Sequence, residues 1–600
     1  MPAGRPAKQE TPYKIIVHTN GGRRYASTKI AVEGKDGKRQ FRHKHWGSLD
    51  ENNRFHPNTT YFNASPSERK KLIFPKDWDL SEAKGRGEDP RGRVAYEKED
   101  VDRQYGATWF LDKVADKTGV REDLMKVFEG NREKVDQVLT MAYFPFVDNL
   151  SYSHLSQWQR EVKAPTEIAM TPKAVTLLTQ SITERERMEM FRCRAARTGK
   201  DELCAVDSTS ISSYGFNLVD IRWGRNKEHL PLRQTVEVVV YSLVSHMPIF
   251  YKELPGNMPD SRTVELIMTE LDHAGFRNLI LITDRGYESM KNLELYISKR
   301  QKVITSVKTG QGDVLEKIKS IDLSTGIPSG MNYDRGRELF YAQYDIKSSV
   351  KGNGDNIIEA DRLKINLYYS VAGRANVITA LQGTIEEQKE TAQGIMDKVE
   401  PIADAAALRR SLSLLALDID AETNMLKGYA LDEDKRSRRL QTAGFFASKT
   451  IGLDMDPITA MDNYGMRDEQ EKCFQLQKGP LGQDRLRTWS ETARKGRMFV
   501  CFVGLILASY VRSVWESNDW LRKRFGSTES VLAEMRTIRC IEHKGKMKFI
   551  TPFVGDQVEI CKIFGLEIPA GCAPSYTSKA STKTGKRGRP AKPKTETQKI

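Results

Sequence analysis

The sequence lacks the cysteine pattern of a zinc site or of a disulfide framework. Its seven cysteines are scattered over 600 residues, and none forms a Cys-x-x-Cys pair. Isolated cysteines in odd number are typical of apolar core fillers in a reducing compartment, so we expect a cytoplasmic protein. The seven are Cys193, Cys204, Cys473, Cys501, Cys540, Cys561 and Cys572.

The sequence also lacks the segments that would direct it to a membrane. Its first residues, starting at Met1 and Pro2, are polar and do not contain the apolar stretch of a signal peptide. The longest apolar run, residues 498–511, is bounded by Arg497 and Arg512. A run of this length is too short to span a bilayer and predicts a buried helix. We therefore expect no membrane partner.

Charge of one sign is in excess. The chain carries 95 Lys and Arg against 80 Asp and Glu, which gives a net charge of +15 and a pI near 9.2. This excess favours partners of dense negative charge, nucleic acid before anionic membranes, although a basic enzyme unrelated to either remains an alternative. With 39% hydrophobic and 29% charged residues the chain reads as globular, and its length predicts three or more domains.

The first third of the chain divides into three predicted parts. Residues 1–62 form a basic β-rich module, in which the runs 13–19 and 25–33 flank a hairpin signal, Asn20-Gly21-Gly22. Residues 63–105 are polar without a clear period and are interpreted as a linker. Residues 106–200 show apolar spacing typical of helices and are predicted to be a helical, DNA-binding domain.

An α/β pattern follows, which predicts a sheet layered with helices. Over residues 201–310 we expect strands at 203–207, 235–244, 248–254, 278–283 and 302–307, with helices at 262–274 and 288–300. Residues 311–451 break this pattern and are predicted to be a β-rich insertion with a helix near 384–398. Residues 452–525 return to long helices, at 456–478 and 497–516. The remaining parts are a C-terminal region, 526–575, and a basic tail, 576–600.

Two aspartates stand where predicted strands end. Asp207 closes the run Cys-Ala-Val-Asp, and Asp284 closes the run Leu-Ile-Thr-Asp. A carboxylate at the end of an apolar strand is fixed to a rigid scaffold, which suits metal coordination. Aspartate is also common in ordinary turns after strands, so each residue alone has a purely structural interpretation.

A predicted helix carries a stripe of four polar side chains. Tyr464, Arg467, Glu471 and Lys478 fall within an arc of about 60° on an ideal helix. A solvated face with an Arg–Glu pair at i, i+4 would explain Arg467 and Glu471. It gives no reason for Tyr464 and Lys478 to share the stripe.

The pattern Tyr-x₂-Arg-x₃-Glu-x₆-Lys resembles the YREK signature of bacterial insertion-sequence transposases of the family named after insertion sequence four. The resemblance extends to Asp207-Ser208-Thr209, to Pro255-Gly256-Asn257 and to Asp284-Arg285-Gly286-Tyr287, and it covers residues 106–525. It implies an α/β, ribonuclease H-like catalytic core with an aspartate–aspartate–glutamate triad. A β-rich insertion before the glutamate is also implied, and 186 residues between Asp284 and Glu471 leave room for one.

The resemblance also implies the chemistry of the site. Asp207, Asp284 and Glu471 would be catalytic and would hold Mg²⁺, for which Mn²⁺ can substitute because the ligands are hard oxygens. Tyr464, Arg467 and Lys478 would bind DNA phosphates near the scissile bond. The implied partners are double-stranded DNA, at the element ends and at the target, and a second copy of the chain on paired ends.

The C-terminal tail is basic. From Lys579 to Lys599 it contains eight Lys and Arg and one acidic residue, Glu596. Arg587-Gly588-Arg589 resembles the core of an AT-hook, which binds the minor groove of A·T tracts. A disordered polybasic tail that binds any phosphate backbone is the alternative.

These observations predict a nucleoid-associated DNA transposase that cleaves the ends of its mobile element and joins them to target DNA. Two alternatives share most of its features. One is a nuclease of the same fold without strand transfer, and the other is an inactivated transposase retained as a DNA-binding protein. Asp220, which lies outside the triad, is expected to be dispensable for cleavage by the transposase.

Overall fold

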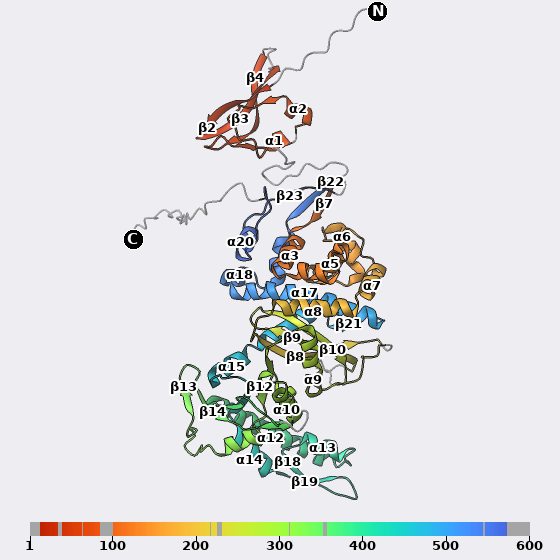
Figure 1. Ribbon diagram of the computed structural model, residues 1–600, viewed down its shortest axis with the longest axis vertical. Coiled ribbons are helices and arrows are strands. Elements are labelled where there is room, and N and C mark those ends of the chain that lie inside the picture. The colour runs from red at the N-terminus through yellow and green to blue at the C-terminus, as the bar shows by residue number, and fades with distance from the viewer. Residues whose placement is uncertain are drawn as a thin grey trace, which may run out of the picture. The chain divides into compact units, whose positions relative to one another are not determined.

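The computed structural model describes residues 13–33, 39–62, 64–83, 100–215, 218–224, 231–310, 312–351, 357–543 and 546–572 (Figure 1). The chain forms two compact units. One comprises residues 1–107, 161–163 and 531–600, and the other comprises residues 108–160 and 164–530.

The N-terminal module is built on a four-stranded antiparallel sheet in the order β2-β3-β4-β5. The strands are β2 (Ile16–Asn20), β3 (Arg23–Glu33), β4 (Arg39–Leu49) and β5 (Phe55–Pro57). Asn20 pairs with Arg23, so Gly21 and Gly22 form the two-residue turn between β2 and β3. Their φ angles of 57° and 77° lie in the left-handed region, where glycine is favoured.

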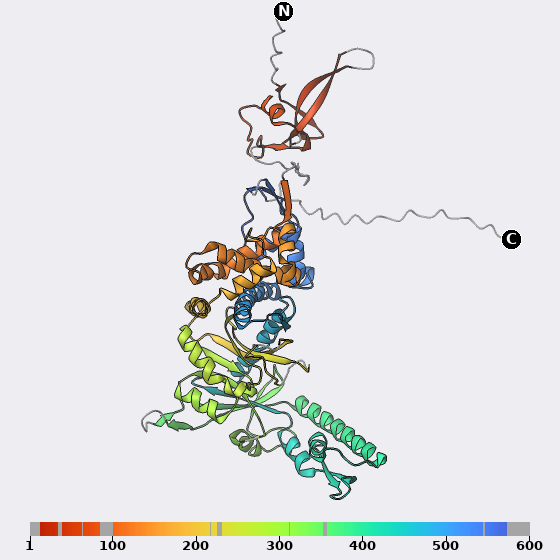
Figure 2. The same cartoon turned by 90° about the vertical axis from the view of Figure 1, so that its right-hand side faces the viewer.

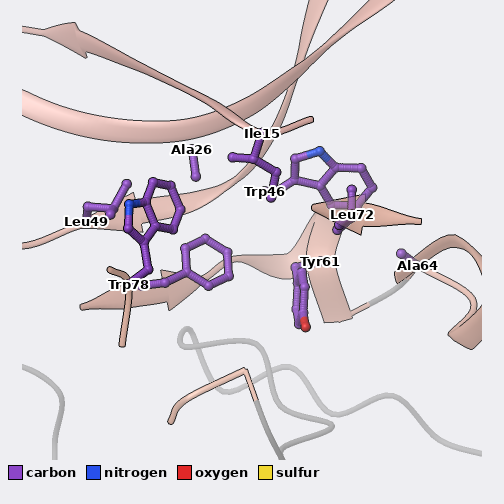
Figure 3. Close-up of a cluster of buried hydrophobic side chains, with 9 residues drawn as sticks. Ile15, Ala26, Trp46, Leu49, Tyr61, Ala64, Leu72 and Trp78 are labelled. Carbon is purple, nitrogen blue, oxygen red and sulfur yellow. The ribbon is translucent and has the colours of Figure 1, made fainter. Parts of the chain in front are cut away.

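The predicted linker, 63–105, is structured at both ends. Residues 64–83 contribute α2 (Pro66–Lys70) and β6 (Leu72–Ile73). Trp78 is buried in the core of the module (Figure 3), and its ring stacks with that of Phe55 at a centroid distance of 5.9 Å. Strand β7 (Asp100–Gln104) joins a second sheet with β22 (Arg539–His543) and β23 (Lys546–Ile550). The linker prediction missed both because each element depends on partners distant in sequence and shows no period of its own.

Six helices occupy the segment predicted to be helical: α3 (Gly106–Lys117), α4 (Val120–Val127), α5 (Arg132–Asp148), α6 (Leu155–Glu161), α7 (Pro172–Gln180) and α8 (Glu184–Arg197). They do not enclose a core by themselves. Helix α17 (Glu491–Ser517) packs against α5 and α7 on one side and against β10 of the large sheet on the other (Figure 1). The apolar spacing of 106–200 is therefore completed by a helix some 300 residues later.

Helix α17 is longer than the apolar run that predicted it. By length and composition its 27 residues could cross a membrane, and 72% of its most apolar window is buried inside the protein. Burial explains the apolar run, because a helix packed on several sides needs apolar residues all round.

The large sheet contains ten strands, nine of them in the order β10-β9-β8-β11-β12-β20-β17-β14-β13, with β21 (Arg485–Leu486) paired to β8. Five strands and two helices lie close to where the sequence predicts them, except that the first strand is longer and runs to Ser213. They are β8 (Leu203–Ser213), β9 (Arg233–Ser242), β10 (Met247–Pro255), α9 (Val264–Ala274), β11 (Ile280–Thr283), α10 (Met290–Ser298) and β12 (Lys302–Val307). β8 and β11 are parallel, as are β11 and β12, whereas β9 and β10 are antiparallel to their neighbours.

The predicted insertion is mixed α/β and not simply β-rich. Its strands β13 (Asn332–Asp334), β14 (Leu339–Asp345), β17 (Lys364–Tyr369) and β20 (Phe445–Ile451) extend the large sheet beyond β12. The rest includes α11 (Gly312–Lys319), α12 (Val371–Lys398), α13 (Ala405–Ser411), α14 (Glu433–Thr442) and two small hairpins, β15 (Ser349–Lys351) with β16 (Ile357–Glu359) and β18 (Leu415–Ile419) with β19 (Leu426–Leu431).

Helix α12 is 28 residues long, about twice the predicted length, and Figure 2 shows it as a long straight helix. Its first half was missed because it contains Gly373 and Gly383 and exposes Val377 and Ile378, so its apolar residues do not follow a helical core pattern.

Candidate active site

The two aspartates lie side by side on adjacent parallel strands. The register of β8 with β11 pairs Val206 with Thr283, so Asp207 and Asp284, the next residues on each strand, reach the same level of the sheet. Asp284 follows the end of β11 as predicted. Asp207 does not end its strand, because β8 continues to Ser213 and pairs with β9 along its whole length. Only its pairing with β11 ends before Asp207, at Val206.

The polar stripe lies on two helices. The predicted helix 456–478 is interrupted at Met466 and Arg467, which gives α15 (Pro457–Gly465) and α16 (Asp468–Lys478). Backbone bonds from Arg467 N to Tyr464 O and from Gln470 N to Arg467 O tighten the turn between them. Tyr464 therefore lies in the last turn of α15, while Glu471 lies in the first turn of α16.

This tight turn brings the stripe to the aspartates. The Tyr464 hydroxyl donates to Asp284 Oδ1 at 3.3 Å. Arg467 donates from Nη1 to Asp207 Oδ2 at 3.5 Å and from Nη2 to Glu471 Oε1 at 3.2 Å. Asp207, Asp284, Tyr464 and Glu471 thus lie around the guanidinium of Arg467.

The charges of this cluster are mutually stabilising. Burial lowers the pKa of Arg467, but Tyr464 and the carboxylates of Asp284, Asp207 and Glu471 outweigh it and raise that pKa above its usual value. The pKa of Tyr464 is also raised, by burial and by the negative charge of Asp284, so the phenol keeps its proton. All three predicted catalytic carboxylates act on the same cation.

Lys478 lies apart from this cluster. It is the last residue of α16, seven residues after Glu471, or about 10 Å along the helix axis. Its charge acts on Glu237, a buried carboxyl on β9 that also accepts a hydrogen bond from the amide of Gln477. Burial raises the pKa of Glu237 to about 8, so this carboxyl is protonated at neutral pH.

The structure adds polar groups that the sequence analysis missed. The hydroxyl of Ser208 donates to Asp260 Oδ1 at 2.7 Å. Burial raises the pKa of Tyr287, and the negative charges of Asp260 and Asp207 raise it further. Asp260 follows a Met-Pro pair and begins the short 3-10 helix η2 (Asp260–Arg262), and no period or motif in the sequence connects it with Asp207. Asp260 comes close to Ser208 only through the pairing of strands in the folded protein.

A cavity of about 270 Å³ adjoins Tyr464. Its lining includes the cations Arg285 and Lys308 and the aromatic rings of Tyr368 and Phe446, which stack with their centroids 4.9 Å apart. Basic groups beside Asp284 place positive charge where a phosphate backbone would need it.

The carboxylates fit a divalent cation by ligand type. Asp207, Asp284 and Glu471 offer only hard oxygen donors, and each already contacts, or acts on, a positive charge. In the part of the chain that the structure describes, no three His, Cys, Asp or Glu side chains are gathered closely enough to hold one metal ion. Arg467 lies between Asp207 and Glu471, so its guanidinium must move before a metal is bound there.

Two predicted DNA-binding residues, Arg587 and Arg589, lie outside the described residues. Asp220, which was expected to be dispensable for the chemistry, takes part in a different ion-pair cluster. It forms an ion pair of 2.6 Å with Arg494, whose side chain is fully buried.

Comparison with known protein families gives a match over the segment that contains the two aspartates. Residues 198–354 match the family model of the transposase DDE domain, a span that contains Asp207 and Asp284 but ends before Glu471. The chain thus contains a segment similar to that domain. No curated protein matches the sequence.

Two solved structures show a distant likeness. The piggyBac transposase synaptic complex with hairpin DNA is 10% identical, with 70% of this chain and 81% of that chain covered and a TM-score of 0.21. The Mos1 transposase paired-end complex with the left transposon end is 12% identical, with 40% and 73% covered and a TM-score of 0.13. At these values the likeness defines neither the fold nor the function of this chain.

Proposed function

We propose that this protein is a DNA transposase that cleaves the ends of a mobile element and joins them to target DNA by divalent-metal-dependent phosphoryl transfer. One observation carries the proposal. Asp207, Asp284 and Glu471, chosen from sequence patterns far apart in the chain, converge on Arg467. The match of residues 198–354 to the transposase DDE domain supports the same assignment.

We infer a ribonuclease H-like core from the scaffold of these residues. Two carboxylates stand on the adjacent parallel strands β8 and β11, and the third stands on α16, which packs against β8. The amide of Gln470 donates to the carbonyl of Val239 on β9 at 2.6 Å and holds this helix to the sheet. Such a scaffold fixes the carboxylates rigidly, as phosphoryl transfer requires.

Each residue has a proposed role. Asp207, Asp284 and Glu471 would hold Mg²⁺ or Mn²⁺, which would supply activation of the attacking oxygen and stabilisation of the leaving oxygen. Arg467 and Tyr464 orient the carboxylates without DNA and bind phosphate when DNA is present. Lys478, at the C-terminal end of α16, would contact the DNA backbone farther along the strand. The DNA partner is double-stranded, the acting species is a dimer on paired ends, and the place of action is the nucleoid.

The test is a cleavage assay with Mg²⁺ on DNA carrying the element ends. Asp207→Asn, Asp284→Asn and Glu471→Gln each keep the shape of the side chain but remove a charged ligand. We expect each to lower the cleavage rate at least about 1000-fold, or roughly 4 kcal/mol of transition-state stabilisation, while end binding survives. Lys478→Ala should lower the rate only partially.

The matched control is Asp272→Asn, because Asp272 is exposed on α9. Asp220→Asn is unsuitable, because it would remove a partner of the buried Arg494. Cleavage near the wild-type rate in any triad variant would remove that residue from the mechanism. Cleavage without a product that joins donor end to target would favour the nuclease alternative, and absence of cleavage by the wild type would favour an inactivated transposase.

A further inference from the structure

Four rings gather on one face of the N-terminal sheet. His18 on β2, Tyr25 on β3, and His43 and His45 on β4 lie on neighbouring strands. His18 and Tyr25 are near-parallel, with centroids 5.5 Å apart and an interplanar angle of 24°. His18 lies 4.8 Å from His45 and 5.5 Å from His43. The rings therefore form one continuous cluster.

This ring cluster faces away from the core of the module. Side chains alternate between the two faces of a strand, and Ala26 and Trp46 point into the core that Figure 3 shows. Their neighbours Tyr25 and His45 consequently point outward. His43 and His45 are exposed, and His18 and Tyr25 are partly exposed, so the rings remain accessible.

The buried hydroxyl of Ser27 holds two rings of the cluster in place. Ser27 is fully buried, and its Oγ lies 3.3 Å from Nδ1 of His18 and 3.2 Å from Nδ1 of His43. The pKa of His18 is lowered by burial and by the neighbouring His45 and His43, which favours a neutral ring at physiological pH. Rings held in fixed orientations are suited to stacking.

The rings His18, Tyr25 and His45 line a groove of about 1150 Å³. Arg23 and Arg24, which follow the β2–β3 turn, also line the groove, together with the acidic residues Asp50, Glu51 and Glu82. Arg24 is held by the carbonyl of Asp50 at 3.1 Å and by Oδ1 of Asn53 at 2.6 Å, whereas Arg23 is exposed. Over the described residues 13–33, 39–62 and 64–83, twelve Lys and Arg against seven Asp and Glu give the module a net charge of +5.

We propose that this outer face of β2–β4 is a binding site for unpaired DNA nucleotides, with bases stacked on Tyr25, His18 and His45 and a phosphate bound by Arg23. Flat rings on the open face of a sheet, flanked by cations, match the way proteins bind single strands. A duplex hides the faces of its bases and would instead require an element that enters a groove. A metal site is not indicated, since the histidines are not among any metal-binding group within the described residues.

The site goes beyond the proposed cleavage activity, and its test measures binding alone, without Mg²⁺. The full chain is titrated into a fluorescent 15-nucleotide oligothymidine and, separately, into a blunt hairpin duplex, at about 0.3 M salt to weaken contacts to phosphate. We expect Tyr25→Ala to weaken binding of the single strand about tenfold, the loss that corresponds to one stacked base, and to leave duplex binding unchanged. Tyr25→Phe, which keeps the ring, should bind as the wild type does.

His45→Ala and Arg23→Ala should each weaken binding of the single strand as well. Lys76→Ala is the matched control for charge, because Lys76 is exposed on the same module but does not line the groove. Unchanged single-strand binding by both Tyr25→Ala and His45→Ala would overturn the proposal. Equal losses for single strand and duplex would overturn it too, because they would indicate a contact to the backbone alone.

Crosslinking provides a readout that does not depend on a folded variant. A wild-type chain irradiated with an oligothymidine that contains 5-iododeoxyuridine should form its adduct within residues 18–45, at Tyr25 or a neighbouring histidine. Adducts that map only to other parts of the chain would place the single strand elsewhere and contradict the assignment.

Discussion

At the scale of single residues, Arg467 is the unusual member of the candidate site. A guanidinium bonded to Asp207 and Glu471 offers these carboxylates the positive charge that a metal would otherwise provide. Side-chain cation and metal ion would then compete for the same oxygens. The guanidinium lets the carboxylates lie close together before any metal or DNA is bound, because its positive charge offsets the repulsion between their negative charges.

This competition predicts how Mg²⁺ changes stability. Arg467→Ala leaves Asp207 and Glu471 without their shared cation, so the variant should be less stable than the wild type in chelator. Added Mg²⁺ should then stabilise the variant more than the wild type, by about 1 kcal/mol for each roughly fivefold gain in affinity. Thermal unfolding with and without Mg²⁺ measures both effects.

The control is the double variant Arg467→Ala with Glu471→Gln, which lacks a ligand and should lose most of the added stabilisation. A Mg²⁺ effect on Arg467→Ala no greater than on the wild type would show that the guanidinium and the metal do not share a site.

At the scale of elements, helix α17 joins several parts of the fold, because it packs against α5, α7 and β10. Phe499 contacts Phe128 with centroids 6.1 Å apart, and Phe502 contacts Phe191 at 5.8 Å. Phe128, which follows the last residue of α4, and Phe191 on α8 thus pack on α17 by their aromatic rings. The segment 106–200, predicted as a separate DNA-binding domain, shares its core with this helix, so a fragment of residues 1–200 would expose apolar surface. Whether the segment binds DNA stays a prediction.

Gly496 shows how closely α17 and α7 approach. A Cβ built at this position would lie 1.9 Å from the backbone carbonyl oxygen of Thr179. Gly496→Ala should therefore force the helices apart and lower the free energy of unfolding by about 2 kcal/mol or more. Chemical denaturation followed by circular dichroism measures this loss.

Gly383→Ala is the matched control, because Gly383 lies inside α12 and a Cβ there meets no atom within 4 Å. This change should raise stability by about 0.5–1 kcal/mol, since alanine is the better helix former. A neutral effect of Gly496→Ala would mean that α7 and α17 are not in this contact.

Glu237 on β9 predicts a pH dependence. Burial raises the pKa of Glu237 from 4.5 to about 8, so between these pH values the folded protein keeps a proton that the unfolded chain has lost. Its contribution to the free energy of unfolding therefore falls as pH rises through this window and levels off above about pH 8. Glu237→Gln removes the proton exchange and keeps a polar partner for Gln477.

Relative to the wild type, Glu237→Gln should gain stability from pH 5 to pH 8, by at most about 1.4 kcal/mol per pH unit. Melting temperatures of both proteins across this range give the difference. If that difference stays constant over the range, Glu237 does not titrate there.

At the scale of the whole molecule, the basic tail is expected to add affinity without selecting a site. Deletion of residues 577–600 should weaken DNA binding broadly and leave the preference for element ends intact. If about six basic side chains contact phosphate, the slope of log K against log salt should flatten by up to about 5. An unchanged slope would mean that the tail does not touch DNA.

A double substitution separates the two interpretations of the tail. Arg587→Ala with Arg589→Ala should abolish any preference for A·T tracts if the segment acts as an AT-hook. If the tail is only polybasic, the same change should flatten the salt slope by about 2 and leave no sequence effect to lose.

The sequence by itself determined which residues were candidates for the site and the order along the chain of the strands that carry them. Asp207, Asp284 and Glu471 could be chosen because side-chain type and local spacing are properties of short segments. The five strands of residues 203–307 could be predicted for the same reason, since each is a continuous apolar run. The β2–β3 hairpin could be predicted from its two glycines.

Only the tertiary structure decided what depends on distant partners. It determined that Asp207 lies inside a strand, that the stripe of Tyr464 and Glu471 is divided between two helices, and that strands of the insertion extend the large sheet. It also placed the ring cluster of the N-terminal sheet, whose members lie up to 27 residues apart, on one face. Strand pairing and burial join residues that no local period relates, and for that reason these features could not be derived from the sequence.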